Sequence, residues 1–369
     1  MTSEVSVFPR ASALIEKGIE DGLHLGAQLY VSLEGQAVGD EAFGEERPDH
    51  PMNPEIILLW MSSVKPITAV AVMQLVEQGR LDLDTRVAEI IPAFAEGGKR
   101  RIAVRHVLTH TGGFRTADAE WRDETWEDAL QRVCAAPMEP DWVPGAKAGY
   151  HIDGAWYVLG EIVQRLTDES YPDYVRNHVF APAGMTHAWI GLPEEILDGS
   201  ELKIGRMFVS KPTGLMPHPF ANTREARQHV RPGGNGRGPI RQLARFYEDL
   251  LSGWLRGESK LLSRDMIRLM TSRQREGLVD QTFQHKMDWG LGFMPDNNRY
   301  GAKTVPYGFG THCSDQAFGH GGAQSSVGMA DPEHELVVAL AFNGMPGEPR
   351  HQKRIRHVMT ALYEDLDLA

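Results

Sequence analysis

The sequence predicts an α/β fold of the α+β kind: one antiparallel sheet built from N- and C-terminal segments and flanked by helices, plus a mostly helical second lobe. Strand-like segments stand at both ends of the chain, at 26–35 and 36–44 and again at 323–332 and 334–344. The clearest helical patterns lie between them. Antiparallel strands from distant parts of a chain can share one sheet, so we expect the two ends to meet.

The length and composition favour two interleaved subdomains. The chain has 369 residues, of which 41% are apolar, and this is enough for a sizeable core. We expect residues 1–66 and 300–369 to form the sheet subdomain and residues 67–299 to form the mostly helical one. An active site is expected in the cleft between them, where ligand sites commonly lie.

The N-terminal elements follow from simple patterns. Residues 11–19 have the spacing of an amphipathic helix, and two strands follow around a turn at Glu34-Gly35. Residues 54–61 are apolar and extended. A helix then begins near Ser62, because Pro66 is tolerated only in a first turn, and Gly79 ends it.

The middle and the end of the chain are predicted in the same way. Residues 161–180 and 239–253 are the clearest helices of the middle segment. Two strands then flank a turn at Asp331-Pro332, and a final helix covers about 349–365. The C-terminal segment is therefore expected to add its strands to the sheet that the N-terminal segment begins.

Composition excludes several classes of function. The net charge is −12, and the basic run Lys99-Arg100-Arg101 is short and isolated, so no nucleic-acid partner is expected. No run of 18 apolar residues exists, so we expect no membrane partner. The first residues lack the pattern of a secretory signal, which predicts a cytoplasmic protein. Cys134 and Cys313 are expected to be reduced, buried thiols.

Ser62 and Lys65 form an S-x-x-K motif between an extended segment and a helix. At this spacing both side chains lie on one helix face. A serine hydroxyl becomes a good nucleophile when a base removes its proton, and a desolvated lysine can serve as that base. A second S-x-x-K, Ser200 to Lys203, sits in a polar stretch without this context.

Other chemistries find weaker support. His106 and His110 have a spacing that suits two metal ligands, but no third ligand follows at a spacing typical of metal sites. The sequence therefore predicts no metal and no cofactor. There is no G-x-S-x-G motif. The glycine-rich run 233–238 lacks the lysine of a phosphate loop and is expected to be a loop that enters a helix.

Five segments resemble one known family. They are 58–87 around the S-x-x-K motif, 105–114 (RHVLTHTGGF), 144–167 around Tyr150, 231–253, and 318–344 around HGG. In this order they are similar to the serine β-lactamase-like and penicillin-binding-protein-like superfamily, and within it to the family VIII carboxylesterases related to class C β-lactamases. The resemblance covers most of residues 25–345 and implies a β-lactamase/DD-peptidase-like fold.

The resemblance implies a role for each matched position. Ser62 would be the nucleophile, Lys65 its proton acceptor, and Tyr150 the general base or relay. The segment His320-Gly321-Gly322 takes the place of the family's K-T-G strand and would bind substrate. The oxyanion hole would consist of the backbone N–H groups of Ser62 and Ala323.

The sequence departs from the family pattern at two positions. The usual Y-x-N reads Tyr150-His151-Ile152 here, and His320 replaces a lysine. His151 and Ile152 would still contribute to substrate binding, and Tyr157 is the rival tyrosine. Histidine is largely neutral at pH 7 where lysine is charged, so both changes favour an uncharged acyl substrate over penicillins.

These features predict a serine hydrolase that acts through an acyl-enzyme on a small-molecule ester, lactone or amide, with esters or lactones preferred. The alternatives are an amide hydrolase of the β-lactamase or D-aminopeptidase type, an acyltransferase, a metal-dependent hydrolase and a non-enzymatic sensor that is acylated by its ligand. A homo-oligomer is left open.

Overall fold

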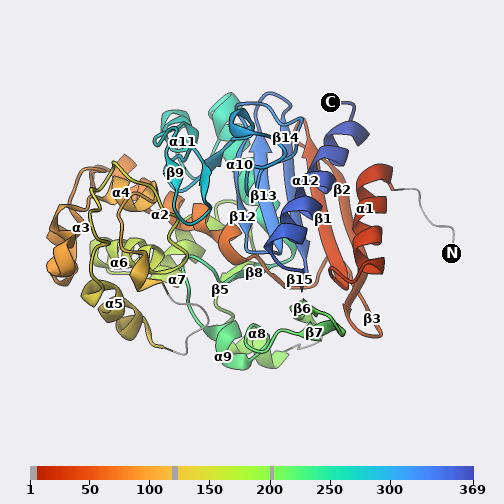
Figure 1. The fold of residues 1–369 in the computed structure, drawn as a ribbon, viewed down its shortest axis with the longest axis horizontal. Helices are drawn as coiled ribbons and strands as arrows, with labels where there is room; N and C mark the ends of the chain where they lie inside the picture. The colour runs from red at the N-terminus through yellow and green to blue at the C-terminus, as the bar shows by residue number, and fades with distance from the viewer. Residues whose placement is uncertain (1–5, 119–123, 200–202) are drawn as a thin grey trace.

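A seven-stranded antiparallel sheet joins the two ends of the chain, as the sequence predicts (Figure 1). The computed structural model describes residues 6–118, 124–199 and 203–369. The strand order is β11-β12-β13-β14-β1-β2-β3. In that order the strands are Met294–Pro295, Phe318–Gly322, Ser326–Asp331, Leu336–Phe342, Gly26–Leu33, Gln36–Arg47 and His50–Pro51. The N- and C-terminal strands meet at the β1–β14 pair, where Leu29 lies opposite Leu340.

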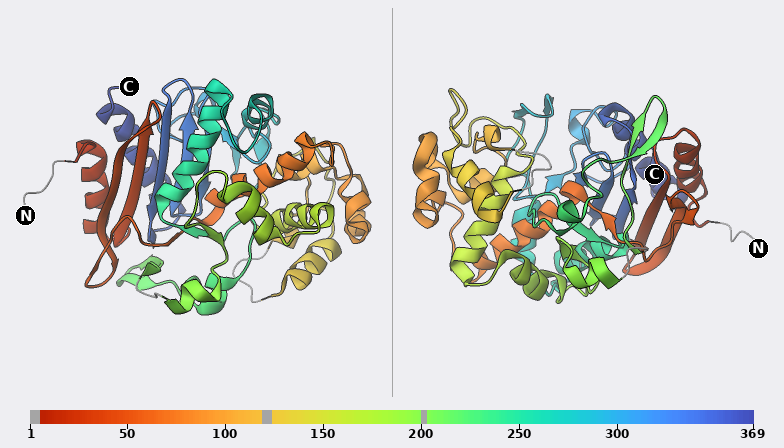
Figure 2. Two further views of the ribbon diagram at one scale, coloured as in Figure 1. Left: turned by 180° about the vertical axis from the view of Figure 1, so that it is seen from behind. Right: turned by 90° about the horizontal axis from the view of Figure 1, so that it is seen from below.

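Helices cover both faces of this sheet (Figures 1 and 2). On one face α1 (Pro9–Glu20) packs against α12 (Glu348–Asp365), and α10 (Ile240–Arg256) contacts β1, β13 and β14 on the other. Strand β14 is buried along its whole length, because successive side chains enter two different cores. Leu340 belongs to the core beneath α12, whereas Ala339 belongs to the core beneath α10.

A largely helical part packs beside the sheet (Figure 1). Its centre is α2 (Lys65–Glu77), which is apolar on almost every side and is buried from Lys65 to Leu75. A helix without a polar face belongs in a core. Around it lie α3 (Val87–Ile90), α4 (Val104–Leu108), α5 (Trp126–Ala135), α6 (Gly154–Thr167) and α7 (Tyr171–Val175).

The remaining elements are short. Small sheets are formed by β4 (Leu58–Leu59), β8 (Gly236–Gly238) and β5 (Trp189–Ile190), by β15 (Gly344–Met345), β6 (Phe208–Lys211) and β7 (Gly214–Pro217), and by β9 (Val279–Asp280) with β10 (His285–Lys286). The other helical segments are η1 (Met61–Val64), η2 (Pro92–Arg101), η3 (Arg115–Ala117), η4 (Arg176–Phe180), α8 (Glu194–Gly199), α9 (Arg224–Gln228), α11 (Arg264–Thr271) and η6 (Asn298–Tyr300).

The single helix predicted over residues 161–180 is wrong. Helix α6 ends at Thr167, and Asp168 has a left-handed backbone with φ 59°. Ser170 then caps α7 by accepting the N–H of Asp173. Apolar residues recur on both sides of residues 168–170. The polar residues 168–170 themselves form a turn between the two helices.

Part of the segment 67–299 packs against the sheet. Both α10 and β11 come from this segment, although the sequence assigns it to the helical subdomain. The division into two subdomains therefore remains a proposal. Cys134 and Cys313 are free and buried, as predicted. Within the described ranges, no helix is both long and apolar enough to cross a membrane.

Candidate active site

Ser62 lies at the junction between the sheet and the helical part. It belongs to the single turn η1, which follows β4 and leads into α2. Pro66 stands in the first turn of α2, the position where proline fits a helix. The preceding residue, Met61, has φ 48°, an uncommon value for a bulky side chain and typical of strain at functional sites.

The hydroxyl group of Ser62 faces a cavity of about 470 Å³. The walls come from the turn η1, the segment before α6, the β9–β10 connection, β12 and the start of α12. The lining residues are Ser62, Tyr150, Ile152, Thr282, Phe283, Met294, Pro306, Tyr307, His320, Gly321, Ala323, Glu348, Pro349 and Gln352.

Lys65 is completely buried beside Ser62. Its Nζ lies 3.0 Å from Ser62 Oγ and also contacts the backbone carbonyls of Ile152, at 2.8 Å, and Gly233, at 2.5 Å. Burial lowers the pKa of Lys65 to about 7, although the nearby carboxylates of Asp153 and Asp118 act to raise it. A substantial fraction of the amine is therefore unprotonated at neutral pH and able to accept a proton.

Tyr150 lies on the other side of the nucleophile. Its hydroxyl group hydrogen-bonds to that of Ser62, and Lys65 Nζ lies 5.2 Å from its ring centroid. Burial raises the pKa of Tyr150 well above its usual value, and the carboxylates of Asp118, Asp280 and Glu348 add to this rise. Tyr150 is therefore a neutral phenol at rest, which can give a proton as well as relay one.

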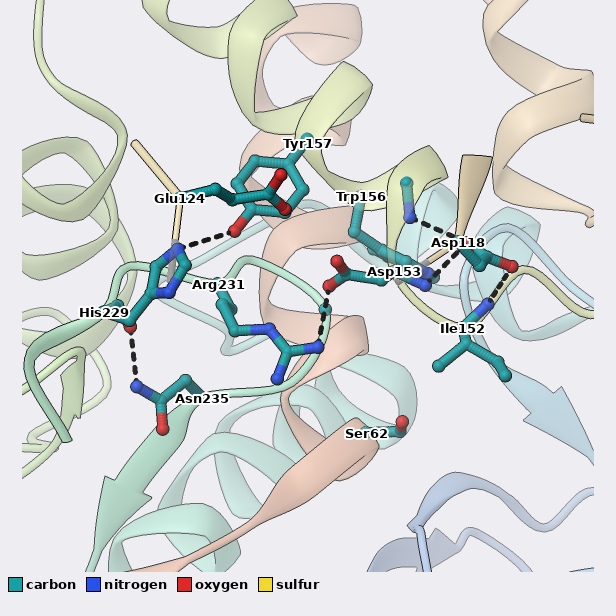
Figure 3. A network of polar contacts seen from close by, with 12 residues as sticks. Ser62, Asp118, Glu124, Ile152, Asp153, Trp156, Tyr157, His229, Arg231 and Asn235 are labelled. Atoms are coloured by element: carbon teal, nitrogen blue, oxygen red, sulfur yellow. Dashed lines mark hydrogen bonds and ion pairs between the residues drawn. The ribbon is translucent and has the colours of Figure 1, made fainter. Parts of the chain in front are cut away.

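The backbone around Tyr150 is held by the β9–β10 connection. Asp280 accepts the N–H of Tyr150 at 3.0 Å, and Thr282 donates to its carbonyl at 2.9 Å. Tyr157, the rival tyrosine, lies on α6 and points toward His229, whose Nε2 is 3.0 Å from its hydroxyl (Figure 3). The fold thus brings Tyr150 to Ser62 and leaves Tyr157 away from it.

A network of polar contacts around Asp118, Asp153 and Arg231 surrounds the start of α6 (Figure 3). Asp118 accepts the N–H groups of Ile152, Asp153 and Gly154 at 2.8–2.9 Å and so caps the N-terminus of α6. This cap holds the Ile152 carbonyl where it meets Lys65. Asp153 in turn lies 3.3 Å from the guanidinium of Arg231. These groups could not be found from the sequence, because their segments are distant along the chain and no motif joins them.

Two hydroxyl groups that no sequence motif indicates connect the nucleophile turn to the sheet. Ser63 Oγ lies 3.0 Å from the His320 carbonyl and 2.9 Å from Ser326 Oγ. Ser326 Oγ lies 2.5 Å from the Trp60 carbonyl. The turn that carries Ser62 is therefore fixed to β12 and β13.

His320 is neutral throughout the physiological range. Burial, and then the charge of Lys65, lower its pKa to about 3. This is far below the ordinary histidine value of 6.5. Its Nδ1 lies 2.7 Å from the Gly321 carbonyl.

The two glycines after His320 have a packing role of their own. A Cβ at Gly322 would lie 2.3 Å from the Trp60 carbonyl, and one at Gly321 would lie 2.4 Å from the Tyr307 ring. The packing of the chain itself therefore requires both glycines, in addition to the substrate binding expected of this segment. Gly321 and Ala323 line the cavity, whereas Gly322 is not among its lining residues.

His151, expected at the substrate, is buried in a structural role. Its backbone N–H donates to Nδ1 of His110 at 3.0 Å, and its Nε2 accepts the N–H of Phe114 at 3.2 Å. Nδ1 of His106 accepts a different N–H, that of Ala103. In the described part of the chain, no group of three or more His, Cys, Asp or Glu side chains is arranged to hold a metal ion. Ser200, of the second S-x-x-K, lies outside the described residues.

Comparisons with known proteins identify the family and the fold. The family model described as Beta-lactamase matches residues 11–363. The esterase/beta-lactamase LipL of Mycobacterium tuberculosis is 25% identical over 348 residues, which cover 86% of this chain and 77% of LipL. A putative D-alanyl-D-alanine carboxypeptidase of Escherichia coli is 24% identical, over 75% of this chain and 66% of its own length. The crystal structure of a family VIII carboxylesterase superposes with a TM-score of 0.79 at 25% identity, covering 97% of each chain.

Proposed function

Because the chain belongs to the Beta-lactamase family and is a serine hydrolase with this fold, we propose that it forms an acyl-enzyme at Ser62 and prefers carboxylic esters or lactones. One observation carries the proposal. Ser62 Oγ lies 3.0 Å from a buried amine whose pKa is about 7, and it also contacts the phenol of Tyr150. A nucleophile, a base and an acid thus meet at one cavity.

In the acylation step, the free amine of Lys65 takes the proton of Ser62 while Oγ attacks the substrate carbonyl carbon. The negative oxygen would be stabilised by the backbone N–H groups of Ser62 and Ala323, two residues that line the cavity. Tyr150 gives its proton to the departing alkoxide when the carbonyl re-forms. The protonated Lys65 then returns a proton to Tyr150, so the acyl-enzyme forms with both groups neutral.

Deacylation uses the same groups with water in place of the alcohol. The relay through Tyr150 to Lys65 removes a proton from water, and the hydroxide attacks the acyl carbon. Ser62 Oγ leaves and recovers its proton from Lys65. The product is a carboxylic acid, and the site returns to its starting state.

The preference for esters rests on the leaving group and on the walls of the cavity. An alkoxide or phenoxide departs more readily than an amine, so esters need less help from an acid. His320 is neutral, and the exposed side chain at Ile152 is a hydrocarbon, so neither position offers a charge or an amide to a substrate. The names of LipL and of the carboxylesterase support this preference, whereas that of the carboxypeptidase supports amide hydrolysis.

Labelling with a fluorophosphonate, followed by intact mass and peptide mapping, tests the nucleophile. One adduct is expected on the peptide that contains Ser62. Ser62→Ala should lose the label and lower kcat/KM for nitrophenyl butyrate by several orders of magnitude. Ser200→Ala, in the second S-x-x-K, is the matched control and should keep both. A label on Ser200 instead would refute the assignment.

Comparison of kcat/KM on one preparation tests the preference. Nitrophenyl butyrate should be hydrolysed clearly, with little or no hydrolysis of a chromogenic cephalosporin. A cephalosporin value equal to or above the ester value would favour the amide-hydrolase alternative.

A further inference from the structure

We propose that the cavity contains a subsite for an organic cation, formed by the carboxylate of Glu348 with the rings of Tyr307 and Phe283. The natural substrate would then be an ester or lactone that carries an ammonium group, in place of the uncharged acyl substrate that the sequence favours. This inference rests on the proposed function of Ser62 and names the substrate class that the same cavity selects.

The first observation is the charge of the cavity wall. Among the lining residues, all of which the structure describes, Glu348 is the one acidic side chain, and no lysine or arginine is present. His320 is neutral because its pKa is about 3. Lys65 is buried behind Ser62 and is not part of the wall. A substrate in this cavity therefore meets a negative charge and no exposed positive one.

The second observation is that neutral partners hold the Glu348 carboxylate in place. The Tyr307 hydroxyl donates to the carboxylate, at 2.9 Å from one oxygen and 2.8 Å from the other. The amide of Gln352 donates to Oε2 at 3.2 Å. Burial raises the pKa of Tyr307 well above its usual value, so this phenol remains a donor. The Tyr307 hydroxyl and the Gln352 amide thus position the carboxylate, and neither donor carries a positive charge.

The third observation is the aromatic surface next to this carboxylate. The ring of Phe283 lies 6.0 Å from that of Tyr307 and 5.0 Å from that of Tyr150, measured between centroids. Aromatic rings beside a carboxylate favour cations, and quaternary ammonium groups in particular. The turn that carries Phe283 is held in place, because Asp280 accepts the N–H groups of Thr282 and Phe283.

The subsite lies within reach of the reacting centre. Glu348 and Tyr150 line the same cavity, and the charge of Glu348 acts to raise the pKa of Tyr150. A substrate whose carbonyl lies at Ser62 can therefore extend a cationic end toward α12. The same charge repels carboxylates, so an anionic substrate is disfavoured at this end of the cavity.

Two isosteric substrate pairs test the proposal on either side of the ester bond. The acyl-side pair is nitrophenyl 4-(trimethylammonio)butanoate and nitrophenyl 5,5-dimethylhexanoate. The alcohol-side pair is choline butyrate and 3,3-dimethylbutyl butyrate. Each pair differs only in a quaternary nitrogen or carbon. In at least one pair, kcat/KM should be about 5- to 30-fold higher for the cation.

Substitutions on α12 locate the source of this preference. Glu348→Gln keeps an oxygen that accepts the Tyr307 hydroxyl, and it should bring the cation-to-neutral ratio to within about twofold of one. Glu348→Lys should reverse the preference. Glu364→Gln, on the same helix but next to Arg10, is the matched control and should leave the ratio unchanged. The ratio cancels any general loss of activity.

A measurement without turnover separates this inference from the proposed hydrolase function. Calorimetric titration with butyltrimethylammonium should show at least fivefold tighter binding to the native chain than to Glu348→Gln. Equal binding, or a cation-to-neutral ratio that Glu348→Gln does not change, would overturn the subsite. Absence of hydrolysis for all four esters, with cation binding still dependent on Glu348, would overturn the hydrolase function alone.

Discussion

At the residue scale, the basicity of Lys65 results from opposing effects on one buried amine. Burial lowers its pKa more than the carboxylates of Asp153 and Asp118 raise it. The resulting value of about 7 suits proton transfer at neutral pH, because a base is most effective when its pKa is close to the working pH. The phenol of Tyr150, whose pKa burial raises, is the complementary acid.

The pH dependence of ester hydrolysis should report Lys65. Its protonated form cannot accept the proton of Ser62, so kcat/KM should fall as the pH decreases through about 7. Measurement of kcat/KM for a neutral nitrophenyl ester between pH 5 and 9 gives this acid limb of the pH profile, in which activity falls as the pH decreases. His320→Asn should keep the limb, because the pKa of His320 is already about 3. Loss of the limb in that variant would assign it to His320 instead.

Asp153 is a positioning residue, and its removal should alter the same limb. Its negative charge raises the pKa of Lys65, so Asp153→Asn should lower that pKa further. The acid limb of kcat/KM should therefore move to lower pH. A merely structural role for Asp153 would reduce the rate without displacing the limb.

Local spacing identifies Ser62 and Lys65, whereas Tyr150 is identified by the resemblance of its segment to a known family. Ser62 and Lys65 are three positions apart, and the structure places their side chains in contact. Asp118, Arg231 and Glu348 were missed, since they reach the site from separate segments and no short motif connects them. The low pKa of His320 could not be predicted from the sequence either, because burial depends on the whole fold.

At the element scale, the N-terminus of α6 links helix stability to the active site. Asp118 satisfies three N–H groups there, and the Ile152 carbonyl beside them contacts Lys65. The start of this helix is therefore determined by a residue from a different segment, which explains why the sequence did not reveal it. By contrast, the hairpin of β13 and β14 was predicted correctly, because strand alternation and the turn at Asp331-Pro332 are local signals.

Removal of this cap should affect both stability and catalysis. Asp118→Ala leaves three N–H groups without their acceptor and should cost about 1–3 kcal/mol of unfolding free energy. Without Asp118 the Ile152 carbonyl should also move from its position beside Lys65, and this displacement should lower kcat. Denaturant unfolding and ester kinetics measure the two effects.

A cap remote from the site provides the matched control. Ser263 caps α11 by accepting the N–H of Met266. Ser263→Ala should cost about 0.5–2 kcal/mol with kcat unchanged. Equal kinetic effects in the two variants would contradict a specific role for the α6 cap.

At the scale of the whole molecule, the two ends of the chain support each other. Asp365, near the end of α12, accepts the N–H groups of Arg10 and Ala11 in the first turn of α1. The two helices pack side by side over one face of the sheet (Figure 1). Loss of one helix would therefore expose the other and the core beneath it.

Asp365→Ala should lower the free energy of unfolding by about 1–2 kcal/mol, because α1 loses its N-terminal acceptor. Since Asp365 is not among the cavity residues, kcat/KM should stay within about twofold of the native value. Glu16→Ala, an exposed position in the middle of α1, should leave stability nearly unchanged. A loss of activity without a loss of stability would contradict this role.

The pairing of β1 with β14 also constrains how the protein is made. Leu33 pairs with Leu336, so β1 leaves the ribosome about 300 residues before its partner. At roughly 5–20 residues per second this interval lasts about 15–60 s. Throughout it, the nascent hairpin of β1 and β2 presents an unpaired edge, the feature that leads strands to aggregate. The yield of active protein therefore depends on the rate of translation and on protection of the nascent chain, as well as on the stability of the finished fold.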